Sequence, residues 1–205
     1  MIGYLKGKIE DIMLLNNSVA QLVIETNNIG FEVLCPAKLY NHFSGIKNET
    51  IVYTQLIMRE TDQVIYGFYT KTDKEMFNNL LSLSGIGPKI ALAVLNSYDA
   101  KTFIEIIIDE NMNALSKISG IGKKNASRLV LELKPKFEQK YADGIDLTDT
   151  KNDKLFTAYD EVYSALKGIG YSNDEIKSSL SRAYADNVND VTEELVSYCL
   201  KSLAN

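Results

Sequence analysis

The hydrophobic residues of this chain change their spacing near residue 70, and this change constrains the fold more than any other feature. Residues 2–70 contain short runs rich in β-branched and aromatic residues, which are typical of strands. From residue 72 onward, apolar residues recur at helical spacing. The 205 residues are therefore predicted to form an α+β protein of several domains, with the strands first and the helices after them.

The strand segment contains five apolar runs, at residues 2–8, 19–26, 29–34, 51–58 and 63–69. Only Arg59-Glu60-Thr61-Asp62 separates the last two runs, which indicates a hairpin. The segment contains no helical pattern long enough to cover a flat sheet. A small closed barrel is expected, because closure removes exposed strand edges. The only histidine, His42, is expected in a solvent-exposed polar loop.

The helical segment divides into two groups. In the first group, the capping-box pattern Thr72-x-x-Glu75 predicts a helix start. Further helices of this group are expected at 88–96, at 100–109 with Asp99 as the N-cap, at 112–117 after Asn111, and at 123–136. Residues 141–154 contain four aspartates and no periodic pattern, and they are predicted to be a flexible linker. A small three-helix bundle is expected beyond it, from helices at 154–167, at 173–185 behind the capping box Ser172-x-x-Glu175, and at 192–203. The predicted domains are residues 1–70, 71–140 and 155–205.

An internal repeat lies in the first helical group. Leu-Ser-Gly-Ile-Gly-Pro-Lys at 83–89 aligns with Ile-Ser-Gly-Ile-Gly-Lys-Lys at 118–124, and a helical stretch follows each copy. The glycines permit a tight turn and close approach, while the next helix presents free N–H groups and its positive dipole end. Two such turns suit two backbone phosphates of a nucleic acid. The candidate residues are Gly85, Ile86, Gly87, Lys89, Gly120, Ile121, Gly122, Lys123, Lys124 and Arg128.

The alternative is that each Gly-Ile-Gly is only a tight turn whose isoleucine fills the core. The duplication, with a lysine at the same offset each time, favours phosphate binding. The charge distribution along the chain also favours phosphate binding. The whole chain carries a net charge of −5, but residues 71–140 have 11 basic and 8 acidic side chains, and the flanking segments are both acidic.

Several classes of protein are excluded by missing residues. Gly122-Lys123 is followed by Lys124 and lacks the Ser/Thr and upstream glycine of a phosphate-binding P-loop, so the chain is not expected to be an ATPase. One histidine and two distant cysteines, Cys35 and Cys199, do not make a zinc site, and reduced thiols are expected. No cofactor and no metal are expected. The longest apolar run has six residues, so neither a membrane span nor a signal peptide is expected.

The acidic residues Glu60 and Asp62 flank the tip of the predicted hairpin. From the residues alone an ordinary solvated turn is favoured, because acidic residues are common in turns and no third carboxylate is nearby in sequence to complete a catalytic site.

Four stretches together carry a family resemblance. They are Met-Ile-Gly-Tyr-Leu-Lys-Gly at 1–7, Arg-Glu-Thr-Asp-Gln-Val-Ile-Tyr-Gly-Phe at 59–68, the two Ser-Gly-Ile-Gly turns, and Ala-Leu-Lys-Gly-Ile-Gly-Tyr at 165–171. In this combination and order, which spans nearly the whole chain, the sequence resembles the RuvA family of bacterial Holliday-junction branch-migration proteins.

The resemblance implies an OB-type barrel, a tandem helix-hairpin-helix domain, a flexible linker and a small UBA-like three-helix bundle. It also implies a cytoplasmic, non-catalytic homotetramer, in some members an octamer, that binds four-way DNA junctions without sequence preference and holds them open and near-planar. Its partners would be the hexameric AAA+ motor RuvB, which hydrolyses ATP, and the resolvase RuvC. Its processes would be homologous recombination, DNA repair and the SOS response.

The resemblance also assigns roles to particular residues. The repeated hairpins would bind phosphates, and Glu60 and Asp62 would form an acidic pin that repels phosphates at the crossover. The family commonly has two adjacent acids here, whereas this chain has Thr61 between them. Leu166, Ile169 and Tyr171 are the candidate residues for docking the motor, although each of them also fits a bundle core.

Two other functions remain open. Helix-hairpin-helix domains occur in base-excision glycosylases and nuclease subunits, but the residues 131–134 after the second hairpin show no catalytic pattern. A protein-interaction scaffold is the second alternative, in which both hairpins would serve subunit contacts.

Overall fold

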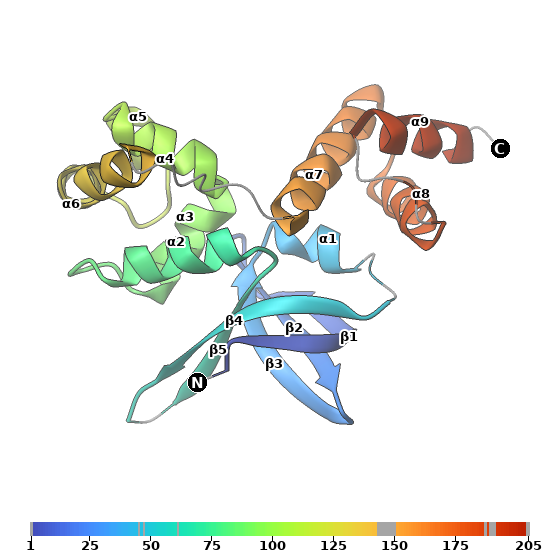
Figure 1. Cartoon of the computed structure of the whole chain (residues 1–205), viewed down its shortest axis with the longest axis horizontal. Helices are drawn as coiled ribbons and strands as arrows, with labels where there is room; N and C mark the ends of the chain where they lie inside the picture. The colour runs from blue at the N-terminus through green and yellow to red at the C-terminus, as the bar shows by residue number, and fades with distance from the viewer. Residues whose placement is uncertain are drawn as a thin grey trace.

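The computed structural model describes residues 2–44, 46, 48–60, 62–142, 151–186, 188 and 192–203. A five-stranded barrel lies at the bottom of Figure 1, and two groups of helices lie above it on opposite sides. The strands are β1 (Tyr4–Leu14), β2 (Val19–Thr26), β3 (Ile29–Pro36), β4 (Thr50–Met58) and β5 (Gln63–Phe68). The prediction of strands followed by helices is confirmed.

The barrel is closed in the order β1-β2-β3-β5-β4. β1 is long enough to pair with both β2 and β4, and a register shift between Ile9 and Asp11 bends it between the two partners. A Cβ on Gly7 would lie only 1.8 Å from the Glu25 carbonyl oxygen, so only glycine fits this crossing. The predicted small closed barrel is confirmed, and its fold is of the OB type.

A short helix that the sequence pattern did not indicate closes one end of the barrel. Helix α1 (Leu39–Ser44) places Leu39, His42 and Phe43 in the barrel core. His42 is only 2% exposed and its ring lies 4.1 Å from that of Tyr69, so the predicted solvent-exposed loop is wrong. The prediction failed because the polar neighbours of His42 concealed an apolar helical face of one and a half turns.

The first helical group contains α2 (Lys71–Leu81), α3 (Pro88–Ser97), α4 (Ala100–Ile108), α5 (Met112–Ser116) and α6 (Lys123–Ala142). The predicted cap of α2 is wrong by two residues, because the Thr70 hydroxyl, not that of Thr72, accepts a hydrogen bond from the Asp73 N–H at 3.0 Å. Asp99 and Asn111 cap α4 and α5 through their side chains. Helix α6 continues past its predicted end and includes Pro135.

The hydrophobic core of this helical group extends onto strand β5, while the barrel interior forms a second cluster of buried residues. The rings of Tyr66 and Phe68, both on β5, lie 5.1 Å and 4.8 Å from the ring of Phe77 on α2. At the far end of α3, the Asn96 side chain accepts a hydrogen bond from the Lys38 N–H and donates one to the Asn17 carbonyl. The sequence boundary at residue 70 therefore separates two kinds of secondary structure, but the helical core crosses it through Tyr66 and Phe68.

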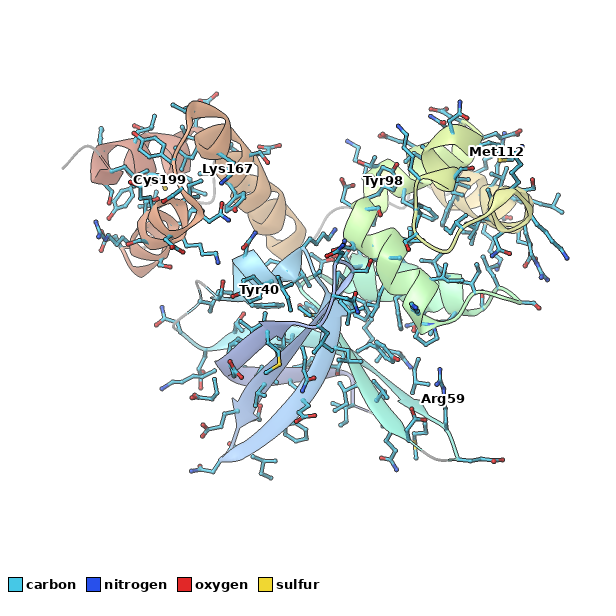
Figure 2. All side chains as sticks on the ribbon, turned by 180° about the vertical axis from the view of Figure 1, so that it is seen from behind. Tyr40, Arg59, Tyr98, Met112, Lys167 and Cys199 are labelled. Carbon is cyan, nitrogen blue, oxygen red and sulfur yellow. The ribbon has the colours of Figure 1, made fainter. Side chains whose placement is uncertain are left out.

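The second helical group contains α7 (Lys151–Ile169), α8 (Asn173–Ala185) and α9 (Thr192–Leu203), which surround a separate small core. The capping box predicted before α8 is present, because the Glu175 carboxylate accepts from the Ser172 N–H at 2.8 Å. Two contacts join this bundle to α1. The Asn41 amide donates to the Tyr163 hydroxyl at 3.4 Å, and Lys177 Nζ lies 4.9 Å from the Tyr40 ring centroid. Tyr40 is labelled at this junction in Figure 2.

The predicted linker at 141–154 falls mainly on residues 143–150, which lie outside the described part of the chain. Helix α6 extends to Ala142 and helix α7 begins at Lys151, so the helices enter the predicted linker from both ends.

Candidate functional site

The two repeated turns adopt the same backbone conformation. Gly85 and Gly120 both have φ +86°, in the left-handed region that glycine adopts without strain. In each turn the isoleucine N–H donates to the carbonyl three residues earlier, from Ile86 to Leu83 and from Ile121 to Ile118. The sequence repeat therefore corresponds to a repeated helix-hairpin-helix structure.

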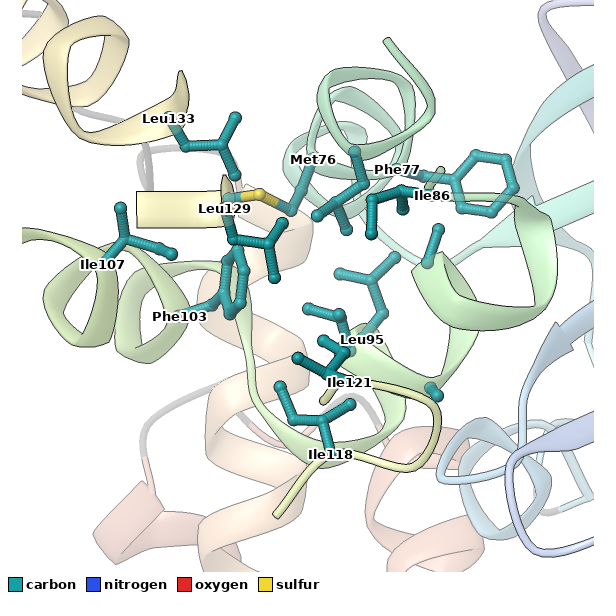
Figure 3. Close-up of a cluster of buried hydrophobic side chains, with 14 of the residues drawn as sticks. Met76, Phe77, Ile86, Leu95, Phe103, Ile107, Ile118, Ile121, Leu129 and Leu133 are labelled. Atoms are coloured by element: carbon teal, nitrogen blue, oxygen red, sulfur yellow. The ribbon is translucent and has the colours of Figure 1, made fainter. Parts of the chain in front are cut away.

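The isoleucines of both turns point into the protein. Ile86 is 6% exposed and Ile121 is 4% exposed. Figure 3 shows both in the cluster that contains Phe77, Phe103 and Leu129. Both side chains fill the core because the turn directs them inward, and the predicted phosphate contact concerns the backbone of the hairpins.

The second glycine of each turn has no structural need to be glycine. Gly87 has φ −97° and ψ 175°, an extended conformation that any residue adopts. Gly122 is not among the positive-φ glycines of the described residues. A Cβ built on either residue would meet no heavy atom within 4 Å. Neither backbone strain nor internal packing therefore explains these glycines.

Several backbone N–H groups at the turns have no acceptor in the described part of the chain. In the first turn they belong to Gly85, Gly87 and Lys89. In the second turn they belong to Gly120 and Gly122. These donors lie at the N-terminal ends of α3 and α6, where the helix dipole is positive. Pro88 occupies the first turn of α3, where its lack of an N–H has no cost.

The predicted cations lie around these turns. Lys89, Lys123 and Lys124 are exposed. Arg128 extends from α6 toward the other turn, because its Nη1 lies 4.0 Å from the position that a Cβ on Gly85 would take. The structure thus brings Arg128 of the second repeat beside the first turn. The candidate glycines and cations of the two repeats are together called the hairpin surface: Gly85, Gly87, Lys89, Gly120, Gly122, Lys123, Lys124 and Arg128.

The sequence patterns did not identify the partner of Arg128. Its Nε donates to Oε1 of Glu132 at 2.5 Å, one turn further along α6. The signal that could have found this pair is the i,i+4 spacing of opposite charges on one helix.

The acidic tip lies at the end of the β4–β5 hairpin, which projects beyond the barrel, with Arg59 labelled near its end in Figure 2. The hairpin is closed by a hydrogen bond of 2.8 Å from the Arg59 N–H to the Asp62 carbonyl. Both acidic side chains are exposed. They differ in surroundings, because Asp62 Oδ2 lies 3.9 Å from Arg59 Nη1, whereas the described residues offer no cation to Glu60. Thr61, between them, lies outside the described residues.

The three candidate docking residues of the second helical group are not equivalent. Leu166 is fully buried, so its side chain belongs to the bundle core and its predicted docking role is corrected. Tyr171 packs partly against the same core. Ile169 is 64% exposed, in the turn that Gly170 makes at φ +107°. Of these three residues, only Ile169 presents a large apolar side chain to solvent.

The described residues give little support for a metal site or for a reactive thiol. They contain no group of three or more His, Cys, Asp or Glu side chains arranged to hold a metal ion. Burial raises the pKa of the Cys35 thiol to about 12, and it also raises that of Cys199. Both thiols are therefore protonated at neutral pH and are poor nucleophiles. No helix in the described ranges is sufficiently long and apolar to cross a bilayer.

A closed OB-type barrel that packs through β5 against a tandem helix-hairpin-helix unit defines the class of this protein. Family models agree with each part. The RuvA N terminal domain matches residues 1–67, the SAM-like helix-hairpin-helix tandem matches residues 77–135, and the RuvA C-terminal domain matches residues 157–204.

Curated relatives match the chain over nearly its whole length. A protein of Crocosphaera subtropica is 34% identical over 96% of this chain and 95% of its own. One of Aliivibrio fischeri is 31% identical over 99% of this chain and 100% of its own. Both are named Holliday junction branch migration complex subunit RuvA. The chain belongs to the RuvA family.

Proposed function

We propose that the chain binds four-way DNA junctions through their backbone phosphates, without sequence preference, and holds them open and near-planar. It does so as a homotetramer, and it is the non-catalytic DNA-binding subunit of a cytoplasmic complex. The ATP-driven RuvB motor supplies the energy for branch migration in this proposal, and the resolvase RuvC shares the junction. The domain division at residues 70, 140 and 155 belongs to the same proposal.

The observation that carries the proposal is the pair Gly87 and Gly122. A glycine is conformationally costly unless the backbone or a close neighbour requires it. Here neither requirement exists inside the chain, because a side chain at either position would point into open space. The close approach of another molecule's backbone would explain a glycine at the same place in both turns.

The positive charge of the hairpin surface indicates that this molecule is an anion. The N–H groups around these glycines lack acceptors in the described chain, and they lie at the positive ends of two helices. Exposed lysines surround them, within a segment whose net charge is +3. Such a surface contacts phosphates and reads few bases, so binding is independent of sequence.

The acidic tip has the opposite sign and explains the preference for a junction. Glu60 and Asp62 repel phosphates, so they disfavour a continuous duplex lying across them and fit the opening at a crossover. The shared core around Phe77 fixes the β4–β5 hairpin relative to α2. Attraction at the hairpin surface and repulsion at the tip therefore act at a fixed separation.

The second helical group is the proposed site for the motor. Its segment, residues 141–205, has 6 basic and 12 acidic side chains, so DNA repels it and it is left free for a protein partner. Among the three sequence candidates, Ile169 is the exposed one and is the proposed contact, with Tyr171 beside it.

The proposal is tested by comparing binding to a four-way junction and to linear duplex of the same sequence. The variants are Gly87→Ala with Gly122→Ala, and Lys123→Glu with Lys124→Glu. Each pair is expected to weaken junction binding about tenfold or more, because every lost phosphate contact is repeated in each subunit. Gly168→Ala is the matched control, since its Cβ would also meet nothing within 4 Å.

The expected result is junction binding that is stronger than duplex binding and falls steeply with salt. Equal affinity for junction and duplex would contradict the proposal. Loss of oligomer mass in the lysine variant, with DNA binding intact, would favour the scaffold alternative instead. Cleavage of branched or damaged DNA by the protein alone would favour the enzyme alternative.

A further inference from the structure

The Arg128–Glu132 pair lies where the two repeats meet. Arg128 belongs to the helix of the second repeat, but its Nη1 lies beside Gly85 of the first, at 4.0 Å from the Cβ position. Its side chain is 43% exposed, so its terminal nitrogens can be reached from outside. The side chain therefore extends along α6 toward the other turn.

Glu132 fixes this direction. Its Oε1 accepts the Arg128 Nε–H at 2.5 Å, and the carboxylate is itself only 34% exposed. A guanidinium has five N–H donors in one plane. The bond to Glu132 uses the one on Nε and leaves the four on the terminal nitrogens, for which the described residues provide no acceptor.

We propose that Glu132 is a positioning residue for DNA binding, which holds the Arg128 guanidinium so that its terminal nitrogens bind a phosphate at the first hairpin. This inference rests on the proposed function. It assigns a favourable role to an acidic residue that simple electrostatics would place among the repulsive ones.

Two physical effects of Glu132 oppose each other. As a charge near phosphates it weakens DNA binding, by an amount that salt screening reduces. As a partner of Arg128 it removes the rotamer freedom that a long side chain would otherwise lose on binding. The guanidinium 2.5 Å away offsets part of the field of the carboxylate, and in this proposal the positioning effect is the larger of the two.

The experiment measures junction affinity for Glu132→Ala and Glu132→Gln, each with Arg128 and with Arg128→Ala. Glu132→Ala is expected to weaken binding about fivefold, although it removes a negative charge. Glu132→Gln is expected to restore most of the affinity, because its amide oxygen still accepts from Nε. With Arg128→Ala present, Glu132→Ala should weaken binding no further, since the two act as one unit.

Glu138→Ala is the matched control. Glu138 is an exposed acid on the same helix and lies 4.0 Å from a cation at i,i+4, Lys134, whose closer partner is Glu110 at 2.6 Å. Its removal should leave binding unchanged or slightly tighter. If the Arg128–Glu132 pair merely stabilised the helix, Glu132→Ala would lower thermal stability but would not differ from Glu138→Ala in junction affinity.

A readout without DNA tests the pairing itself. The Arg128 Nε–H signal in NMR should exchange slowly with solvent in the wild type and in Glu132→Gln, and rapidly in Glu132→Ala. Junction binding that is equal or tighter in Glu132→Ala would overturn the positioning role alone. A wild-type protein without any preference for junctions would overturn the proposed function, and this role with it.

Discussion

Arg128 Nη1 lies 4.0 Å from the point where a Cβ on Gly85 would stand, although the two residues belong to different repeats. Gly120 makes the reciprocal approach, because its Cβ would lie 3.4 Å from Ile90 in the helix of the first repeat. Each turn is thus packed against the helix that follows the other turn. The two hairpins form one unit, and a change in either turn acts on both.

Gly85→Ala is expected to lower the free energy of unfolding by about 1 to 2 kcal/mol, because φ +86° is strained for any residue with a Cβ. Chemical denaturation monitored by circular dichroism measures the loss. Gly87→Ala should change stability much less, since its backbone is extended and its surroundings are open. Equal losses in the two variants would show that the turn geometry is not the reason for the first glycine.

Glu60→Gln is expected to tighten junction binding by up to about fivefold, because it removes a charge that repels phosphates. Asp62→Asn should have a smaller effect, since Arg59 lies 3.9 Å from that carboxylate and already offsets part of its field. Titration of a fluorescent junction at low salt measures both. Weaker binding in either variant would contradict the repulsive role of the tip.

Phe77→Ala is expected to cost about 3 to 5 kcal/mol of stability, because this fully buried ring joins the core of α2 to Tyr66 and Phe68 of the barrel. In the wild type, the barrel and the first helical group should unfold together in one transition, because the contacts of Phe77 couple them. Hydrogen exchange checks this point, since separate unfolding of the two parts in wild type would mean that the shared core does not couple them.

His42 is expected to make stability depend on pH. Burial lowers its pKa to about 3 in the folded chain, from 6.5 when exposed. Between these values only the unfolded chain binds the proton, so stability falls as pH falls, by about 1.4 kcal/mol per pH unit for this group. The His42→Gln variant should be less stable than the wild type at neutral pH. Its free energy of unfolding should depend less on pH, because the contribution of His42 is absent. Denaturation midpoints between pH 7 and pH 4 measure it, and equal slopes in both proteins would disprove it.

Local features were predicted well because short-range physics determines them. The glycine turns, the caps at Asp99 and Asn111 and the capping box at Ser172 depend on neighbours within a few residues, and their residue types indicate them directly. The cap of α2 was misplaced because Thr70 and Thr72 both fit the pattern. Only the backbone position of Thr70 brings its hydroxyl to the Asp73 N–H.

The burial of a side chain could not be predicted where its polarity, or that of its neighbours in sequence, disagrees with its position in the fold. His42 has polar neighbours in sequence but faces the barrel core from α1. Leu166 and Ile169 are both apolar and close in sequence, yet one is fully buried and the other is 64% exposed. The difference arises because Leu166 lies on the inner face of α7, while Ile169 lies at its end, where the chain turns away at Gly170.

The sequence by itself determined the order of strands and helices, the closed barrel and the duplicated turn, because hydrophobic period and glycine placement act locally along the chain. The tertiary structure alone decided that Arg128 lies beside Gly85, that Glu132 orients it, and that Phe77 joins the helices to the barrel. These relationships connect residues on different elements. They exist only once packing has excluded water from the core between them, and no local pattern encodes that geometry.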